Sequence, residues 1–147
     1  MPANRIVGHR LVSGSDLLPN PANWRQHSQG QRSVMEALLD RVGWVSEAIA
    51  VETPDGLMLL DGHLRAEISA NDDIPVTVVD LTPEEQRLVL ASLDPVAAMA
   101  GVDTEACNLL AASIEDNGQV RALLDAVAAG DYVPLMADDE TTGRIGW

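Results

Sequence analysis

The most informative run of residues in this chain is Leu60-Asp61-Gly62-His63-Leu64-Arg65-Ala66-Glu67, called here the Gly62 turn. It joins an apolar run typical of a strand, residues 57–60, to a run with helical character, residues 64–70. Where a glycine joins a strand to a helix, the first N–H groups of the helix lack acceptors within it, and they favour an anion. Arg65 adds a forked cation about one turn into the helix, with a shape suited to phosphate or carboxylate. The Gly62 turn is therefore a predicted anion site.

This anion site is predicted in a strongly acidic chain. The 147 residues include nine Arg, no Lys and 23 acidic residues, which give a net charge of −14. Residues 1–45 hold five Arg and three acids, a balance of +2, whereas residues 46–147 hold four Arg and twenty acids, a balance of −16. A field of this sign repels nucleic acid and anionic membranes at long range. Direct DNA binding by the chain alone is therefore disfavoured, and no membrane binding is expected.

The composition is that of a folded protein with one core. Apolar residues make up 46% of the chain, and 147 residues are enough to bury a single core. Cys107 is the only cysteine, so the sequence excludes a disulfide framework and a cysteine-rich zinc site. No apolar run approaches the roughly 18 residues of a membrane span, and the N-terminus has no apolar signal core. We expect a cytoplasmic protein.

Apolar periodicity predicts an α/β (α+β) fold followed by helices. Strands are expected at 10–13, 48–51, 57–60 and 74–79, and helices at 31–42, 64–70, 83–93, 95–100, 103–113 and 119–129. Pro54-Asp55-Gly56 is a turn of the kind that closes hairpins, and Thr82-Pro83-Glu84-Glu85 is a helix start with a hydroxyl cap. We expect a small mixed sheet flanked by helices, with an all-helical C-terminal extension.

Breaks in this pattern divide the chain into four expected segments. Residues 1–9 are a flexible arm, residues 10–93 form the α/β domain, residues 94–130 form the helical extension, and residues 131–147 are a mobile acidic tail. The boundary after residue 93 falls at Asp94-Pro95, because the residue before a proline is disfavoured in a helix.

Several short motifs within residues 10–93 follow one another in a known arrangement. In chain order they are a loop with Asn20-Pro21, Asn23 and Arg25, a helix ending at Gly43, then Asp55-Gly56, Gly62-His63-Leu64-Arg65 and Ile74-Pro75-Val76. In this order and spacing they resemble the ParB N-terminal-like (ParB/sulfiredoxin) superfamily. The closest variety is the Gly-His-x-Arg form of phage and mobile-element proteins, which often stands alone or precedes a DNA methyltransferase domain.

The resemblance implies a nucleotide site at the Gly62 turn. In partition-type members the Gly-x-x-Arg turn binds a nucleoside triphosphate, with the helix start and the arginine on the phosphates. Gly62 and Arg65 match that pattern, and Arg25 matches the arginine of the first loop. The expected phosphate- or nucleotide-binding residues are Asn23, Arg25, Gly62, His63 and Arg65. An Mg²⁺ ion bridging Asp61 and phosphate oxygens would reconcile this carboxylate with a bound anion.

Two residues of the turn depart from the family's patterns. His63 replaces the acidic residue usual in partition proteins, and Leu64 replaces an arginine. The later Glu-Asn-x-x-Arg box and the helix-turn-helix DNA reader are absent, so neither a CTP switch nor centromere-like DNA binding is implied. Sulfiredoxins carry a catalytic cysteine where this chain has His63, and Cys107 lies outside residues 10–93, so sulfinic acid repair is excluded.

Three functions fit the sequence, and we favour the first. The first is a ParB-like nucleotide- or phosphate-binding module, accessory or regulatory in phage or plasmid DNA metabolism. The second is an enzyme of this fold, a nucleotide hydrolase, nuclease or kinase-like phosphotransferase. His63 or Glu67 would then act as the catalytic base, and Arg65 would stabilise phosphate charge. The third is an adaptor whose helices at 95–130 dock a DNA-processing protein such as a methyltransferase, or a second copy in a homodimer.

The same residues also have ordinary structural explanations. Arg65 paired to one of the many acids would only support the fold, and His63 bonding across the turn would do no chemistry. If Asp61 caps the helix, its carboxylate takes the donors that a phosphate would use. The three histidines are scattered and the sequence holds no cluster with metal-ligand spacing, so no metal site is expected.

Overall fold

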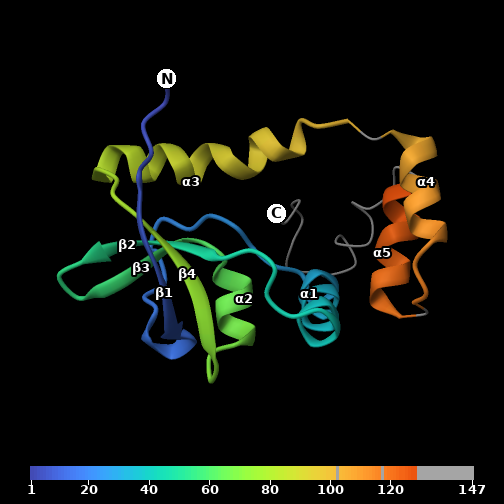
Figure 1. The fold of residues 1–147 in the computed structure, drawn as a ribbon, viewed down its shortest axis with the longest axis horizontal. Coiled ribbons are helices and arrows are strands. Elements are labelled where there is room, and N and C mark those ends of the chain that lie inside the picture. The colour runs from blue at the N-terminus through green and yellow to red at the C-terminus, as the bar shows by residue number, and fades with distance from the viewer. Residues whose placement is uncertain (102, 117, 129–147) are drawn as a thin grey trace. The chain divides into compact units, whose positions relative to one another are not determined.

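The computed structural model describes residues 1–101, 103–116 and 118–128 (Figure 1). The predicted acidic tail at 131–147 lies outside the described residues. The chain forms two compact units, which we treat separately. The first unit is made of residues 1–24 and 44–96, and the second of residues 25–43 and the described residues from Ala97 onward. The four segments expected from the sequence stay predictions.

The first unit is built on a four-stranded mixed sheet in the order β1-β4-β2-β3 (Figure 1). The strands are β1 (Ile6–Ser13), β2 (Ala48–Thr53), β3 (Gly56–Asp61) and β4 (Asp73–Val79). β4 pairs antiparallel with β1 and parallel with β2, and β2 and β3 form an antiparallel hairpin. The small mixed sheet predicted from the sequence is therefore confirmed.

The core lies on one face of this sheet. Side chains alternate between faces along a strand, so Ile74, Val76 and Val78 of β4 are all buried while the residues between them are partly exposed. The same core takes in residues from β2, β3, helix α2 (His63–Ile68) and the loop after β1; these are Ala48, Ala50, Leu57, Leu59, Ala66 and Leu17. In Figure 1, α2 is drawn to the right of β4. The Gly62 turn therefore begins at the end of β3, a strand of this sheet.

β1 begins at Ile6, four residues before the start expected from the sequence. Ile6 to Ser13 pair with Val79 to Asp73 of β4, and Asp80 donates its N–H to the carbonyl of Arg5. Residues 6–9, expected in the flexible arm, are thus part of the strand. Their pairing depends on a strand some seventy residues away, which local periodicity does not reveal.

Helix α3 (Pro83–Ala98) starts as expected but runs further. Thr82 and Glu85 form a capping box: the Thr82 hydroxyl accepts the Glu85 N–H at 3.2 Å, and the Glu85 carboxylate accepts the Thr82 N–H at 2.9 Å. The helix continues through Pro95, although the sequence predicts an end before Asp94-Pro95. Proline removes one N–H, but Ala91, whose carbonyl would accept it, is exposed, so water can satisfy that carbonyl.

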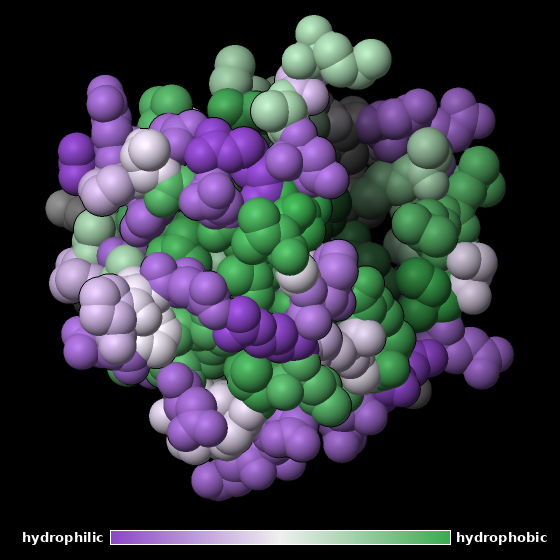
Figure 2. Space-filling model, turned by 60° about the vertical axis from the view of Figure 1, so that its left-hand side comes forward, coloured by the Kyte–Doolittle hydropathy of each residue, from purple (hydrophilic) through white to green (hydrophobic). Residues whose placement is uncertain are grey.

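α3 buries no residue and leaves large apolar side chains exposed. Leu88 and Leu93 are among them, with 67% and 49% of their surface exposed. In Figure 2 hydrophobic residues likewise appear among hydrophilic ones on the face that is drawn. The contacts of the helix with the rest of the first unit include the Arg5–Glu85 ion pair and a 2.7 Å hydrogen bond from the Trp24 indole to the Leu90 carbonyl.

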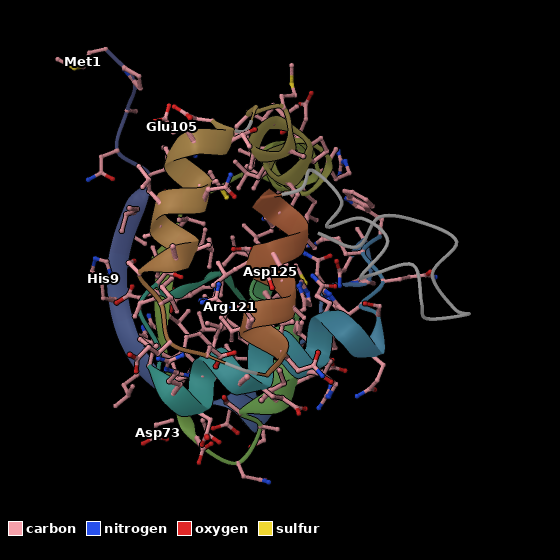
Figure 3. All side chains as sticks on the ribbon, turned by 90° about the vertical axis from the view of Figure 1, so that its right-hand side faces the viewer. Met1, His9, Asp73, Glu105, Arg121 and Asp125 are labelled. Atoms are coloured by element: carbon pink, nitrogen blue, oxygen red, sulfur yellow. The ribbon has the colours of Figure 1, made fainter. Side chains whose placement is uncertain are left out.

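The second unit is helical. It contains α1 (Gln29–Arg41), α4 (Thr104–Ala112) and α5 (Gln119–Ala128), and α5 packs against both of the others. Arg121, which projects from α5 (Figure 3), donates through Nη2 to the carbonyl of Ala111 at 2.9 Å. The Asp116 carboxylate accepts the Arg121 N–H and a 3.2 Å hydrogen bond from Arg41 of α1. The all-helical extension is thus confirmed for its described residues, and α1 groups with it. No described helix has the length and apolar character needed to cross a membrane.

Candidate functional site

Gly62 is required at its position for two reasons. Its φ is +96°, in the left-handed region that residues with a side chain rarely adopt. A Cβ at Gly62 would also lie 2.9 Å from the Cβ of Ala48, at the start of β2. The turn therefore passes too close to β2 for any side chain. As the N-cap, Gly62 accepts the N–H of Ala66 at 2.9 Å and begins α2.

Asp61 does not occupy the position from which its carboxylate would compete with a bound anion for the first N–H groups of α2. Asp61 is the last residue of β3, and Gly62, not Asp61, occupies the N-cap position of α2. The charge of Asp61 raises the pKa of Arg65, while the larger effect, burial, lowers it. Arginine is effectively always protonated in proteins, so Arg65 stays positively charged.

Arg65 is held in one orientation by two residues that precede β2. Its Nη1 donates to the carbonyl of Ser46 at 2.7 Å and to the Ser46 hydroxyl at 2.8 Å. The guanidinium carbon lies 4.8 Å from the centre of the Trp44 ring. Nη2 lies on the side of Gly62, 3.4 Å from where a Cβ of that residue would be. Among the described residues, Arg65 makes no salt bridge with a carboxylate, in contrast to the ion-paired Arg5 and Arg10.

His63 faces the protein interior. It is 9% exposed, and its Nε2 lies 3.2 Å from the backbone nitrogen of Asn20, which donates the hydrogen bond. An imidazole nitrogen that accepts an N–H carries no proton, so His63 joins α2 to the loop through this acceptor. Glu67, one turn later, is exposed. The catalytic roles of His63 and Glu67 stay predictions.

The Asn20–Asn23 loop is tied to the Gly62 turn through Asn20. Asn20 is 7% exposed, its side-chain oxygen accepts the N–H of Ala22 at 2.9 Å, and its carbonyl accepts the N–H of Asn23 at 3.0 Å. Asn23, which is half-buried, therefore lies in a loop anchored to His63. Arg25 belongs to the second unit, and its approach to the turn stays a prediction.

Three residues of this region were not among the predicted site residues: Asn20, Trp44 and Ser46. Asn20 stands in the Asn-Pro motif of the first loop, which was a usable signal. Trp44 and Ser46 lie in an irregular segment between α1 and β2, where no periodicity points to a role. Their contact with Arg65 joins positions about twenty residues apart and exists only in the folded chain.

A hollow of about 890 Å³ lies elsewhere in the first unit. It is lined by β1, the short 3₁₀ helix at Gly14–Asp16 and the β2–β3 hairpin, with exposed acids such as Asp16 and Asp55 at its rim. None of the predicted site residues lines it. The described residues contain no group of three or more His, Cys, Asp and Glu side chains placed to hold a metal ion.

Comparison with solved structures establishes the fold. The C-terminally truncated chromosome-partitioning protein ParB from Caulobacter crescentus, complexed with CTP-gamma-S, matches 88% of this chain and 77% of its own with a TM-score of 0.59. The identity over this match is 13%. The chain has a ParB/sulfiredoxin-like fold. This confirms, at the level of fold, the resemblance drawn from the motifs.

Other structures match this fold more weakly. Sulfiredoxin from Arabidopsis thaliana matches 57% of this chain and 98% of its own, with 14% identity and a TM-score of 0.47. The Caulobacter crescentus ParB complexed to the centromeric parS site matches 86% of this chain and 70% of its own, with 16% identity and a TM-score of 0.48. No protein-family model matches the sequence, and no curated protein matches it either. The Gly-His-x-Arg variety stays a prediction.

Proposed function

We propose that this chain is a nucleotide- or phosphate-binding domain of the ParB-like fold, and that its ligand sits at the Gly62 turn. The proposal rests on the contacts of Arg65. This arginine is a partly buried cation whose two donated hydrogen bonds go to neutral Ser46 oxygens. In a chain with 23 acids, an arginine that makes no salt bridge among the described residues has donors available for an anion.

The backbone of the turn adds donors beside Arg65. The first N–H groups of α2 have no acceptors within the helix, and Gly62 at the N-cap has no side chain that could accept from them. α2 is only six residues long, so its dipole is small and Arg65 must supply most of the attraction. Asn23, in the loop held by Asn20, is proposed as a further ligand-binding residue, and Arg25 as a second cation.

A nucleoside triphosphate is the first ligand to consider. The matching ParB structure is complexed with a CTP analogue, and that likeness in fold supports testing CTP before other nucleotides. Asp61 would hold an Mg²⁺ ion, which would supply positive charge for the phosphates. Binding is favoured over turnover, because the Nε2 of His63 already accepts a backbone N–H and Glu67 is exposed.

The setting of the domain is proposed from the motif resemblance. A Gly-His-x-Arg domain of this kind would act as an accessory or regulator in phage or plasmid DNA metabolism, beside a DNA-processing protein such as a methyltransferase. The exposed apolar side chains of α3 favour such a partner or a second copy of the chain. Direct DNA contact is opposed by the net charge of −14.

Calorimetric titration of the purified protein with CTP, the other nucleoside triphosphates and inorganic phosphate, with and without Mg²⁺, tests the proposal. We expect saturable binding of at least one of them, weakened more than tenfold in Arg65→Ala, since an arginine–phosphate contact contributes on the order of 1.5–3 kcal/mol. The matched control is Arg87→Ala, which removes the same charge from an exposed site on α3. Circular dichroism and thermal melting must show that both variants are folded. Absence of binding to the wild type, or equal affinity in Arg65→Ala, would contradict the proposal.

A further inference from the structure

We propose that Trp44 and Ser46 are positioning residues for Arg65, which orient its guanidinium so that it meets the anion through Nε and Nη2 and not through the Nη1–Nη2 fork. This inference rests on the proposed function and adds to it how the arginine is presented. Three observations support it. Ser46 accepts hydrogen bonds from Nη1 of Arg65, the Trp44 ring lies against the guanidinium, and Nη2 lies on the side of Gly62.

Ser46 saturates one nitrogen of Arg65. A guanidinium Nη carries two N–H groups, and Nη1 of Arg65 has two acceptors, the Ser46 carbonyl at 2.7 Å and the Ser46 hydroxyl at 2.8 Å. No donor on Nη1 is then left for a ligand. The end-on fork formed by Nη1 and Nη2, the common arrangement for a carboxylate or phosphate, cannot be offered without breaking a Ser46 contact.

Trp44 sets the plane of the guanidinium. Its ring centre is 4.8 Å from the guanidinium carbon, within the range of a cation–π contact, and the tryptophan itself packs against the buried core of the sheet. A ring fixed by the core on one side restrains the arginine on the other. Arg65 is therefore held before a ligand arrives, and it loses less side-chain freedom on binding than an arginine in solvent would.

The remaining donors are on the side of the Gly62 turn. Nη2 lies 3.4 Å from where a Cβ of Gly62 would be, so the absence of that Cβ leaves room beside it. Nε and Nη2 lie along the same edge of a guanidinium, and together they form a side-on pair of donors. An oxyanion at the turn would thus meet the Nε–Nη2 edge of Arg65.

The first measurement needs no ligand. In ¹⁵N-edited NMR spectra of the whole protein, the Nη1 N–H signals of Arg65, identified by their loss in Arg65→Lys, should be sharp and slow to exchange with water. We expect Trp44→Leu and Ser46→Ala to broaden them or speed their exchange at least fivefold. Trp44→Phe, which retains an aromatic face, should preserve them, and so should Ser92→Ala, a serine on α3 far along the chain. Signals unchanged in both Trp44→Leu and Ser46→Ala would overturn the positioning role.

The second measurement is calorimetric affinity for CTP and inorganic phosphate. Trp44→Leu and Ser46→Ala should bind about tenfold more weakly, whereas Trp44→Phe and Ser92→Ala should stay within about twofold of the wild type. If Trp44→Leu does not fold, Ser46→Ala and Trp44→Phe still decide the matter. Full affinity in Ser46→Ala would refute the inference while leaving the proposed function standing. A wild type that binds neither these ligands nor the other nucleoside triphosphates, with ordered Arg65 signals, would instead refute the proposed function and leave the positioning of Arg65 supported.

Discussion

Gly62 shows how one residue can be required by two independent constraints. Its φ of +96° favours glycine, and the 2.9 Å approach of a Cβ to Ala48 excludes every other residue unless β2 moves. The turn and the strand behind it are thus coupled at a single position. Any substitution there must affect both the start of α2 and the sheet.

We therefore expect Gly62→Ala to lower the free energy of unfolding by about 2 kcal/mol or more, because it adds backbone strain to a steric clash. Gly8→Ala is the matched control: nothing lies within 4 Å of its Cβ position, and the change should stay within about 0.5 kcal/mol. Urea unfolding followed by circular dichroism measures both. Equal stability of the two variants would mean that the turn can relax away from Ala48.

His63 is the second residue whose role the folded chain clarifies. Its Nε2 accepts the N–H of Asn20 in a buried position, so His63→Leu would leave that N–H without its partner. We expect a loss of about 1–3 kcal/mol in the free energy of unfolding. His9→Leu, at an exposed position of β1, is the comparison and should cost less than half as much. Urea unfolding decides it; if the two losses are alike, the Asn20 contact does not stabilise the fold.

At the scale of elements, α3 buries no residue, and the ion pair between Glu85 and Arg5 is one of the polar contacts that attach it. Glu85 accepts hydrogen bonds from the Arg5 guanidinium at 2.5 and 3.0 Å and from the N–H of Thr82. These contacts, that of Arg5 first, lower the pKa of Glu85 from 4.5 to about 2. A carboxyl group whose pKa is lowered by folding stabilises the folded state above its unfolded pKa and loses that contribution as the pH falls.

The contribution of Glu85 should accordingly be complete above about pH 4.5 and vanish toward pH 2. We expect wild type to be more stable than Glu85→Gln at pH 7, with the difference shrinking between pH 4.5 and 2. Thermal unfolding of both proteins across this range measures it, and the other carboxyl groups cancel in the comparison. Glu84→Gln, a neighbouring acid exposed on α3, provides the control. A difference that is constant with pH would show that Glu85 acts only as a neutral hydrogen-bond acceptor.

At the scale of the whole molecule, the negative net charge distinguishes this chain from a typical DNA-binding protein. The net charge is −14, and 20 of the 23 acids lie after residue 45. Long-range repulsion of this kind is strongest at low ionic strength. A phosphate at Arg65 would interact with that guanidinium at short range, where one nearby cation can outweigh the repulsion from the rest of the chain.

We therefore expect no retardation of a short DNA duplex in gel shifts at low salt, either with the protein alone or with CTP present. The absence should persist in Arg65→Ala, because the field of the whole chain and not one site is responsible. Binding that appears at low salt and disappears as salt rises would contradict this prediction, since it would reveal a cationic surface.

The sequence by itself determined the parts that depend on neighbours along the chain. Periodicity located the hairpin of β2 and β3, the capping box at Thr82 and Glu85 and the strand–glycine–helix order of the Gly62 turn, because each is a local pattern. Motif order was also enough to indicate the ParB/sulfiredoxin-like fold, which the structural match confirms.

Only the tertiary structure decided what depends on contacts between distant residues. Pairing with β4 extended β1 back to Ile6, and packing with α5 placed α1 in the helical unit. The close approach to Ala48 made Gly62 indispensable, and Trp44 with Ser46 set the orientation of Arg65. These contacts join residues between fourteen and about ninety positions apart, and no local pattern encodes them, because their energies exist only once the chain has brought the partners together.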